Sequence, residues 1–293
     1  MTNPIHCRSQ RDTARRGPSG RRVLAGAISA SLMLLAAPTP ALAKAKVNEE
    51  FELFAQCPVA THGVRYCVVA KTTSGEFKVG SKTVTINKTI TMQGGLTEGS
   101  NQLVPATNGE TLSKTPLTLP GGLIGIELGS VTEVTATTEL AGPVLINEGN
   151  IADGTGAAVV LPIKVKLENP ALGNECYIGS DAEPITLELT TGTTDPPSPN
   201  KPISGNPGTL TLNSEDTIFT LSDNSLVNNS FASPGVNGCG ESLAPVIDPV
   251  VDVDAGLPAA AGTNTAILNG TVYESTAKAV KKSHVTKSSS GKG

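Results

Sequence analysis

Residues able to act as bases or nucleophiles are scarce in this chain. Ser-His-Asp and Cys-His mechanisms both need a histidine base, and the chain has three histidines. Only His62 lies outside the two terminal segments, between Cys57 and Cys67. Because no Gly-x-Ser-x-Gly motif is present either, we expect His62 to be a solvent-facing loop residue. The sequence therefore predicts no catalytic residue and a protein that is not an enzyme.

Acidic residues leave two further kinds of site to consider. A carboxylate pair can hydrolyse glycosidic bonds, but spacing along a sequence does not pair the 26 acids. The segment from Asp252 to Gly256 resembles the start of a calcium loop, yet a ligand should stand where Gly256 lies and no Glu closes the loop. We expect Asp248, Asp252 and Asp254 on the solvent side of a helix, and we predict no metal or other cofactor.

The cysteines indicate a disulfide framework. Cys7 lies in the N-terminal leader, so four cysteines remain: Cys57, Cys67, Cys176 and Cys239. An even number in an exported chain is typical of two disulfides, with three possible pairings. We favour the pairing of Cys57 with Cys67, which closes a short loop, and of Cys176 with Cys239. No Cys-x-x-Cys pair is present, which disfavours zinc.

The N-terminus has the pattern of a secretory signal peptide, residues 1–43. Six arginines precede an apolar run at residues 23–37, which is short for a membrane span. Ala41-Leu42-Ala43 forms an A-x-A cleavage site, so cleavage is expected between Ala43 and Lys44, with Ala43-Lys44-Ala45 as the alternative site. The pattern predicts a secreted protein, extracellular or cell-wall associated, and it does not decide between general and twin-arginine export.

Loss of the leader changes the charge. Removing six arginines and Asp12 leaves 16 basic and 25 acidic residues, a net charge of −9. Five lysines follow the last acid, Glu274, so the body carries about −14 and the C-terminal segment +5. An acidic body repels phosphates, which excludes nucleic acid as its partner. We expect residues 277–293 to be a basic disordered tail, and either a simple solubilising end or a tether to an anionic cell-wall polymer or membrane surface.

Two segments in the middle of the chain alternate apolar and polar residues. A period of two places one set of side chains on one face of a strand. The expected buried residues are Ile163, Val165 and Leu167 in one strand and Ile185, Leu187 and Leu189 in the other; the expected outward residues are Lys164, Lys166, Glu168 and Glu188. We expect a solvated charged face, with a charge-lined binding face as the alternative. Pro162 cannot donate to a ladder, so we expect it at an edge or bulge.

Other segments complete a mainly β chain. Residues 84–92 predict a hairpin with a three-residue loop, Asn87-Lys88-Thr89, that opposes Ile86 with Ile90. Further strands are expected at residues 129–140, 209–213, 217–221 and 266–273. We expect a turn at Thr73-Ser74-Gly75, a loop at residues 147–155, and an extended proline-rich crossing at residues 193–207.

One segment has the period of a helix, residues 242–255. Its apolar residues recur at helical spacing: Leu243, Val246, Ile247, Val250 and Val251. Pro245 suits the first turn, Pro249 should kink or split the helix, and Gly256 is a suitable C-cap.

Several phrases resemble a group of uncharacterised secreted proteins of actinobacteria. They are Cys57-Pro58, Gly80-Ser81-Lys82-Thr83-Val84, Asn87-Lys88-Thr89-Ile90-Thr91, Leu167-Glu168-Asn169-Pro170, Cys176-Tyr177-Ile178-Gly179-Ser180 and Gly238-Cys239-Gly240. The resemblance implies an extracellular, β-rich protein with Cys176 and Cys239 in framework roles. It implies no activity.

Together these patterns predict an antiparallel β sandwich or distorted barrel, stapled by disulfides, with one short helical segment near the C-terminus. Residues 44–276 form the body, as one domain or two closely packed ones. The leading hypothesis for function is a secreted, non-enzymatic envelope or extracellular interaction or structural protein. The alternatives are a binder of small molecules or lipids with a cavity between its sheets, and a carboxylate-based hydrolase. The ligand, the specific partner and the oligomeric state do not follow from the sequence.

Overall fold

The computed structural model describes residues 49–121 and 133–290. The expected signal peptide and its cleavage site at Ala43 and Lys44 lie outside these residues, as does the start of the strand expected at residues 129–140. The chain is mainly β, and every strand pair among the described residues is antiparallel. All of these residues belong to a single unit, Ala41–Gly293.

The first sheet is built around the longest strand, β1. Its strand order is β11 (Thr209–Leu212), β12 (Ile218–Asn228), β14 (Thr265–Thr276), β1 (Val64–Val79), β3 (Ile90–Thr97) and β4 (Leu103–Pro105), with β2 (Lys82–Ile86) also paired to β1. The hairpin of β11 and β12 and the late strand β14 confirm the predictions for these segments, although β14 lies in the interior of the sheet.

The second sheet is built around β8 (Val159–Glu168). Its order is β13 (Val236–Asn237), β9 (Tyr177–Ile178), β8, β6 (Val134–Leu140) and β5 (Leu117–Leu119), and β10 (Ile185–Leu189) and β7 (Leu145–Ile146) also pair with β8. The alternation predicted for β8 and β10 is confirmed, because Ile163, Leu167 and Leu187 are all at most 2% exposed. The charged residues between them face outward.

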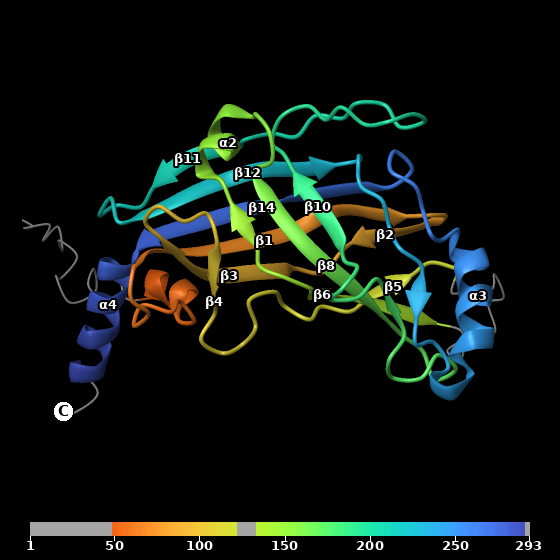
Figure 1. Ribbon diagram of the computed structural model, residues 1–293. Helices are drawn as coiled ribbons and strands as arrows, with labels where there is room; N and C mark the ends of the chain where they lie inside the picture. Colours follow the sequence, from red (N-terminus) through yellow and green to blue (C-terminus); the bar gives the residue numbers. More distant parts are fainter. Residues whose placement is uncertain (1–48, 122–132, 291–293) are drawn as a thin grey trace, which may run out of the picture. The chain divides into compact units, whose positions relative to one another are not determined.

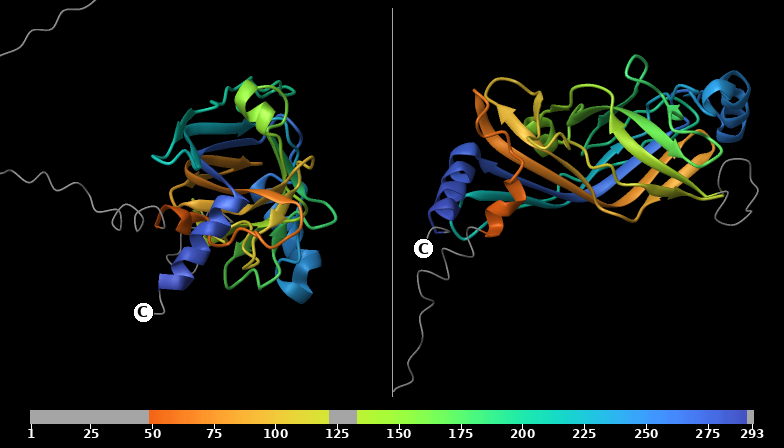
Figure 2. Two further views of the ribbon diagram at one scale, coloured as in Figure 1. Left: turned by 90° about the vertical axis from the view of Figure 1, so that its left-hand side faces the viewer. Right: turned by 90° about the horizontal axis from the view of Figure 1, so that it is seen from below.

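The two sheets pack face to face as a sandwich (Figures 1 and 2). The main core joins residues of the first sheet, such as Val84 and Leu96, to residues of the second, such as Ile163 and Leu187. Of the two architectures that the pattern allowed, the sandwich is the one observed. Main-chain hydrogen bonds between Thr190 and Val227 also connect the end of β10 to β12.

Pro162 lies within β8, which has partner strands on both sides, and not at the edge or bulge that we predicted. Its carbonyl accepts a hydrogen bond from the Ala141 N–H, so its backbone faces the gap where β6 has ended and β7 has not begun. A residue without an N–H is tolerated there because no partner strand needs that donor.

The hairpin predicted at residues 84–92 is wrong. β2 and β3 both pair with β1, β2 along Gly75–Val79 and β3 along Val64–Thr72. The residues 87–89 therefore connect two consecutive strands on one edge of β1. β1 also runs through the turn expected at Thr73-Ser74-Gly75, where its pairing with β14 has a bulge between Thr72 and Ser74. Gly75 has φ +132° at this point, where a side chain would strike the Ile267 carbonyl oxygen.

Both disulfides have the favoured pairing. Cys57–Cys67 encloses the loop with His62, which is exposed as expected. Cys176–Cys239 connects the residue before β9 to the segment after β13. The proline-rich segment differs from prediction: it folds back on itself, because Thr194 N–H donates to the Ile203 carbonyl and Gly205 N–H to the Gly192 carbonyl.

The predicted helix is observed as a 3₁₀ turn, η3 (Glu241–Leu243), followed by α3 (Ala244–Ala255). Pro245 lies in the first turn, Gly256 caps the helix with φ +66°, and the helix continues through Pro249 without splitting. The predicted apolar stripe is only partly buried: Val251 is 4% exposed, whereas Leu243, Val246 and Val250 are 50–66% exposed.

The three aspartates of α3 lie differently from the solvent-side positions that we predicted. The Asp248 carboxylate accepts from the Gly238 and Cys239 N–H groups, and Asp252 accepts from the Val236 N–H. Asp254 forms a 2.8 Å ion pair with Lys82. These contacts fix the helix to β13 and to the β1–β2 turn, since unpaired N–H groups would be costly.

The segment expected to be a disordered tail instead begins with a helix, α4 (Ala277–Ser290). Ala277, Val280 and Ser283 are buried, at the i, i+3, i+6 spacing that places side chains on one helix face. Ala277 and Val280 pack in a second core with Phe51 and Phe54 of the 3₁₀ turn η1 (Phe51–Phe54) and with Val69 of β1. Figure 1 shows α4 and η1 at one end of the sandwich and α3 at the other.

Candidate functional site

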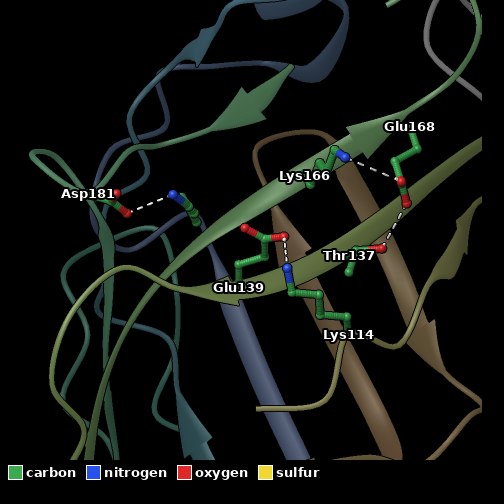
Figure 3. Close-up of polar contacts among 7 residues, drawn as sticks. Lys114, Thr137, Glu139, Lys166, Glu168 and Asp181 are labelled. Carbon is green, nitrogen blue, oxygen red and sulfur yellow. Dashed lines mark hydrogen bonds and ion pairs between the residues drawn. The ribbon is translucent and has the colours of Figure 1, made fainter. Parts of the chain in front are cut away.

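The first candidate surface is the charged outer face of the second sheet (Figure 3). Lys164, Lys166 and Glu168 of β8 lie opposite Glu139, Thr137 and Thr135 of β6 in the strand register. This is the face that the alternation in the sequence predicted.

Its charges are compensated from within the protein. Lys164 pairs with Asp181 at 2.8 Å, and Lys114 pairs with Glu139 at 3.1 Å. Glu168 accepts from the Thr137 hydroxyl at 3.1 Å and lies 3.6 Å from the Lys166 ammonium. The hydrogen bond that the Lys164 ammonium donates to the Asp181 carboxylate raises the pKa of Lys164. Because these groups already have partners, the surface behaves as a solvated sheet face, and it is the weaker candidate.

The space between the sheets is also a weak candidate. Two apolar cavities there have volumes of about 70 and 40 Å³, lined by residues such as Phe77, Leu161 and Val165. Pockets that bury small molecules usually measure about 300–1,000 Å³. The described inter-sheet cavities are therefore too small for the ligand that one of our hypotheses placed between the sheets.

The strongest candidate is a groove between the first sheet and the short helix α2 (Glu148–Asp153). It has a volume of about 410 Å³ and is lined by residues of α2, the segment before β11, and strands β11, β12 and β14. In Figures 1 and 2, α2 lies beside β11 and β12. We name this feature the α2 groove; its lining residues are Glu148, Ile151, Ala152, Pro207, Gly208, Leu210, Phe219, Leu221, Val272 and Glu274.

α2 occupies residues that we expected to form a loop. The Asn147 side chain accepts from the Asn150 N–H and caps the N-terminus, while Gly154 ends the helix with φ +64°. The Thr191 hydroxyl donates to the Ile151 carbonyl at 2.7 Å, which holds the helix against the end of β10. Asparagine at the N-cap and glycine after the last turn are known helix signals, and they could have revealed α2.

The floor of the α2 groove is set by the strand register. Leu210, Leu221 and Val272 form one cross-strand row, and Leu212, Phe219 and Glu274 form the next. Phe219 is therefore a direct neighbour of the Glu274 side chain, and the apolar rows extend toward the exposed edge strand, where Leu210 is 62% exposed.

Two carboxyl groups meet in the α2 groove. Glu274 of β14 forms a side-chain hydrogen bond with Glu148 of α2. Burial is the main cause that raises the pKa of Glu274 to about 7, and the charge of Glu148 adds to it. Near neutral pH the Glu274 carboxyl is therefore partly protonated. Sequence reasoning missed both residues, because their separation in the chain hides the contact.

A second feature is the lysine-bearing face of α4. Lys278, Lys281 and Lys282 are exposed, opposite the face buried through Ala277, Val280 and Ser283. Helix α4 therefore presents these cations to solvent from a folded and anchored element.

The described part of the chain has neither a cluster of metal-binding side chains nor a membrane-spanning helix. There, no three or more His, Cys, Asp or Glu side chains gather as a metal site requires. None of the helices described is long and apolar enough to cross a membrane. No family model matches the chain, and no curated protein or solved structure shows significant similarity to it.

Proposed function

We propose that the mature chain is a secreted, non-enzymatic interaction protein of the extracellular space or cell envelope. Its disulfides and its N-terminal leader suit an oxidising extracellular compartment. The observation that carries the proposal is the orientation of α4. This helix buries Ala277 and Val280 against η1 and β1 and turns Lys278, Lys281 and Lys282 outward.

This arrangement separates charge within one protein. The body carries about −14, whereas the C-terminal segment carries +5. Each lysine near an anionic surface stabilises binding to that surface by about 1 kcal/mol. Three lysines together therefore raise the affinity for the surface about a hundredfold. The acidic body is repelled by the same surface. α4 would therefore face the anionic polymer or membrane and leave the rest of the sandwich, including the α2 groove, accessible to other partners.

The test is co-sedimentation of the chain from Lys44 with cell walls of the producing organism and, separately, with vesicles of anionic or neutral lipid. The variant replaces Lys278, Lys281 and Lys282 with Gln. A matched control replaces the exposed lysines Lys88, Lys114 and Lys201 with Gln, the same change in charge. Loss of salt-sensitive binding in the α4 variant alone supports the proposal. Equal loss in both variants would show that net charge acts without α4.

A carboxylate-based hydrolase is the second candidate, and the Glu148–Glu274 pair is the observation that favours it. Two carboxyl groups sharing a proton also occur in aspartic proteases. Glycoside hydrolysis is disfavoured, since its two carboxyl groups stand about 5 Å or more apart, farther than a direct hydrogen bond allows. Turnover of casein at pH 5 that is lost in Glu148→Gln and Glu274→Gln would establish the hydrolase; absence of turnover leaves the binding protein.

A further inference from the structure

The α2 groove has an apolar part and an acidic part, and small-molecule sites commonly combine an apolar lining with a few polar groups. One part of its wall is apolar, formed by Leu210, Phe219 and Leu221 from β11 and β12. The other part carries Glu148 and Glu274, which are the two charged residues among its described lining. Its volume of about 410 Å³ falls within the range of small-molecule pockets.

We propose that the α2 groove binds a small amphipathic primary amine. Its ammonium group would be held between the carboxyl groups of Glu148 and Glu274, and its apolar body would lie against Leu210, Phe219 and Leu221. The proposal uses no residue of α4, so it stands or falls independently of the envelope tether.

The charge of the α2 groove favours a ligand that is a cation. Both charged residues in the lining are acids, and the surrounding body is strongly acidic, so an anion would be repelled. A primary ammonium has three N–H donors, which suits two adjacent carboxyl groups, one from α2 and one from β14. Phe219, beside Glu274 in the register, can also contact the cation through its ring face.

The apolar part of the groove disfavours a metal ion as the ligand. Calcium takes six to eight oxygen ligands, and two glutamates do not provide them. A metal ion would not cover Leu210, Phe219 and Leu221, whereas an alkyl chain would remove their exposed surface from water, which is favourable. An amine with an apolar body satisfies both parts of the wall.

Proton release should accompany binding. The groups that face the Glu274 side chain are Glu148 from α2 and, in the strand register, the apolar residues Val68 of β1 and Phe219 of β12. With the pKa of Glu274 raised to about 7, a proton occupies the pair at pH 6 and has largely left at pH 8. A cation competes with that proton, so amine affinity should rise as the pH rises between these values.

The test is calorimetric titration of the chain from Lys44 with octylammonium, below its micellar concentration, at pH 6 and pH 8. We expect up to about tenfold tighter binding at pH 8, with proton release near pH 7 seen as a dependence of the heat on the buffer. Octyl sulfate and octanol test the charge, and methylammonium tests the apolar body. These ligands need no variant, so the test does not depend on a mutant that folds.

Two variants locate the site. Glu274→Gln should remove the pH dependence, and Glu148→Gln with Glu274→Gln should remove at least nine-tenths of the octylammonium affinity. Glu188→Gln, an exposed acid on the outer face of β10, is the matched control and should bind as the wild type does. Equal binding of octyl sulfate, undiminished binding by the double variant, or no octylammonium binding to the folded protein would each overturn the proposal.

Discussion

Glu274 of β14 and Glu148 of α2 form a side-chain hydrogen bond, although the two residues lie 126 positions apart in the chain (274 − 148). The contact lies in a groove whose other described lining residues are uncharged. Because the pKa of Glu274 is raised to about 7, the charge of this contact changes near neutral pH.

Stability should fall as pH rises toward neutrality. Glu274 loses its proton near its ordinary value of 4.5 when unfolded and at about 7 when folded. The folded state therefore binds more protons between these values, so its stabilisation is complete below 4.5 and is lost as pH rises through 7. After allowance for partial exposure, we expect a loss of about 1–2 kcal/mol. Urea denaturation at pH 4.5 and 8 measures it, and Glu274→Gln should remove this part of the difference.

Adjacent residues of β10 should respond very differently to truncation. Leu187 is 2% exposed in the core between the sheets, so Leu187→Ala should destabilise the protein by about 2–5 kcal/mol. Glu188 points outward, and Glu188→Ala should change stability by less than about 0.5 kcal/mol. Similar effects from the two substitutions in chemical denaturation would contradict the strand orientation.

Asp248 should anchor α3 through two backbone groups. Its carboxylate accepts from the N–H groups of Gly238 and Cys239, so Asp248→Ala should cost about 2 kcal/mol or more by leaving both donors unpaired. Val253 lies on the same helix and is 83% exposed. Val253→Ser serves as the control, and its melting temperature should stay close to that of the wild type.

Deletion of residues 277–293 should destabilise the body. α4 covers Phe51, Phe54 and Val69, and its removal would expose this small core to water. A clear drop in melting temperature is expected, together with exposed apolar surface detected by dye binding. An unchanged melting temperature would mean that the segment contributes no packing, as a disordered tail would.

The disulfides should differ in their contributions. Cys176–Cys239 closes a segment with a separation of 63 residues, against 10 for Cys57–Cys67. Loop closure alone gives about 4 kcal/mol for the first and about 3 kcal/mol for the second. Denaturation of the two double-alanine variants tests this order, and a larger loss from the Cys57–Cys67 variant would reverse it.

Local patterns in the sequence identified which residues are buried better than they identified which strands pair. The alternation in β8 and β10 depends on burial alone, and Leu167 and Leu187 are buried as expected. We correctly predicted strands at Val84, Ile86 and Ile90. The alternation of apolar residues does not specify, however, which strand each of them pairs with. The long edge of β1 accepts both strands in succession, so no hairpin forms.

Local patterns in the sequence did not predict the α2 groove, for a different reason. Asn147 and Gly154 carry the signals of a short helix, which we interpreted as a loop. Even with α2 assigned, the meeting of Glu148 and Glu274 depends on how the sheets fold together. Similarly, the lysine-rich composition of α4 suggested disorder, while the spacing of Ala277, Val280 and Ser283 that docks the helix extends over only two turns.

The central claim is that α4 holds the protein to an anionic surface through its lysines. The most direct measurement is the affinity of the chain from Lys44 for vesicles with anionic lipid across a series of salt concentrations, for the wild type and for the α4 variant with Gln at positions 278, 281 and 282. The account predicts wild-type affinity that falls steeply with salt, and about a hundredfold weaker binding by the variant at low salt. Equal affinities and equal salt dependence in the two proteins would contradict it.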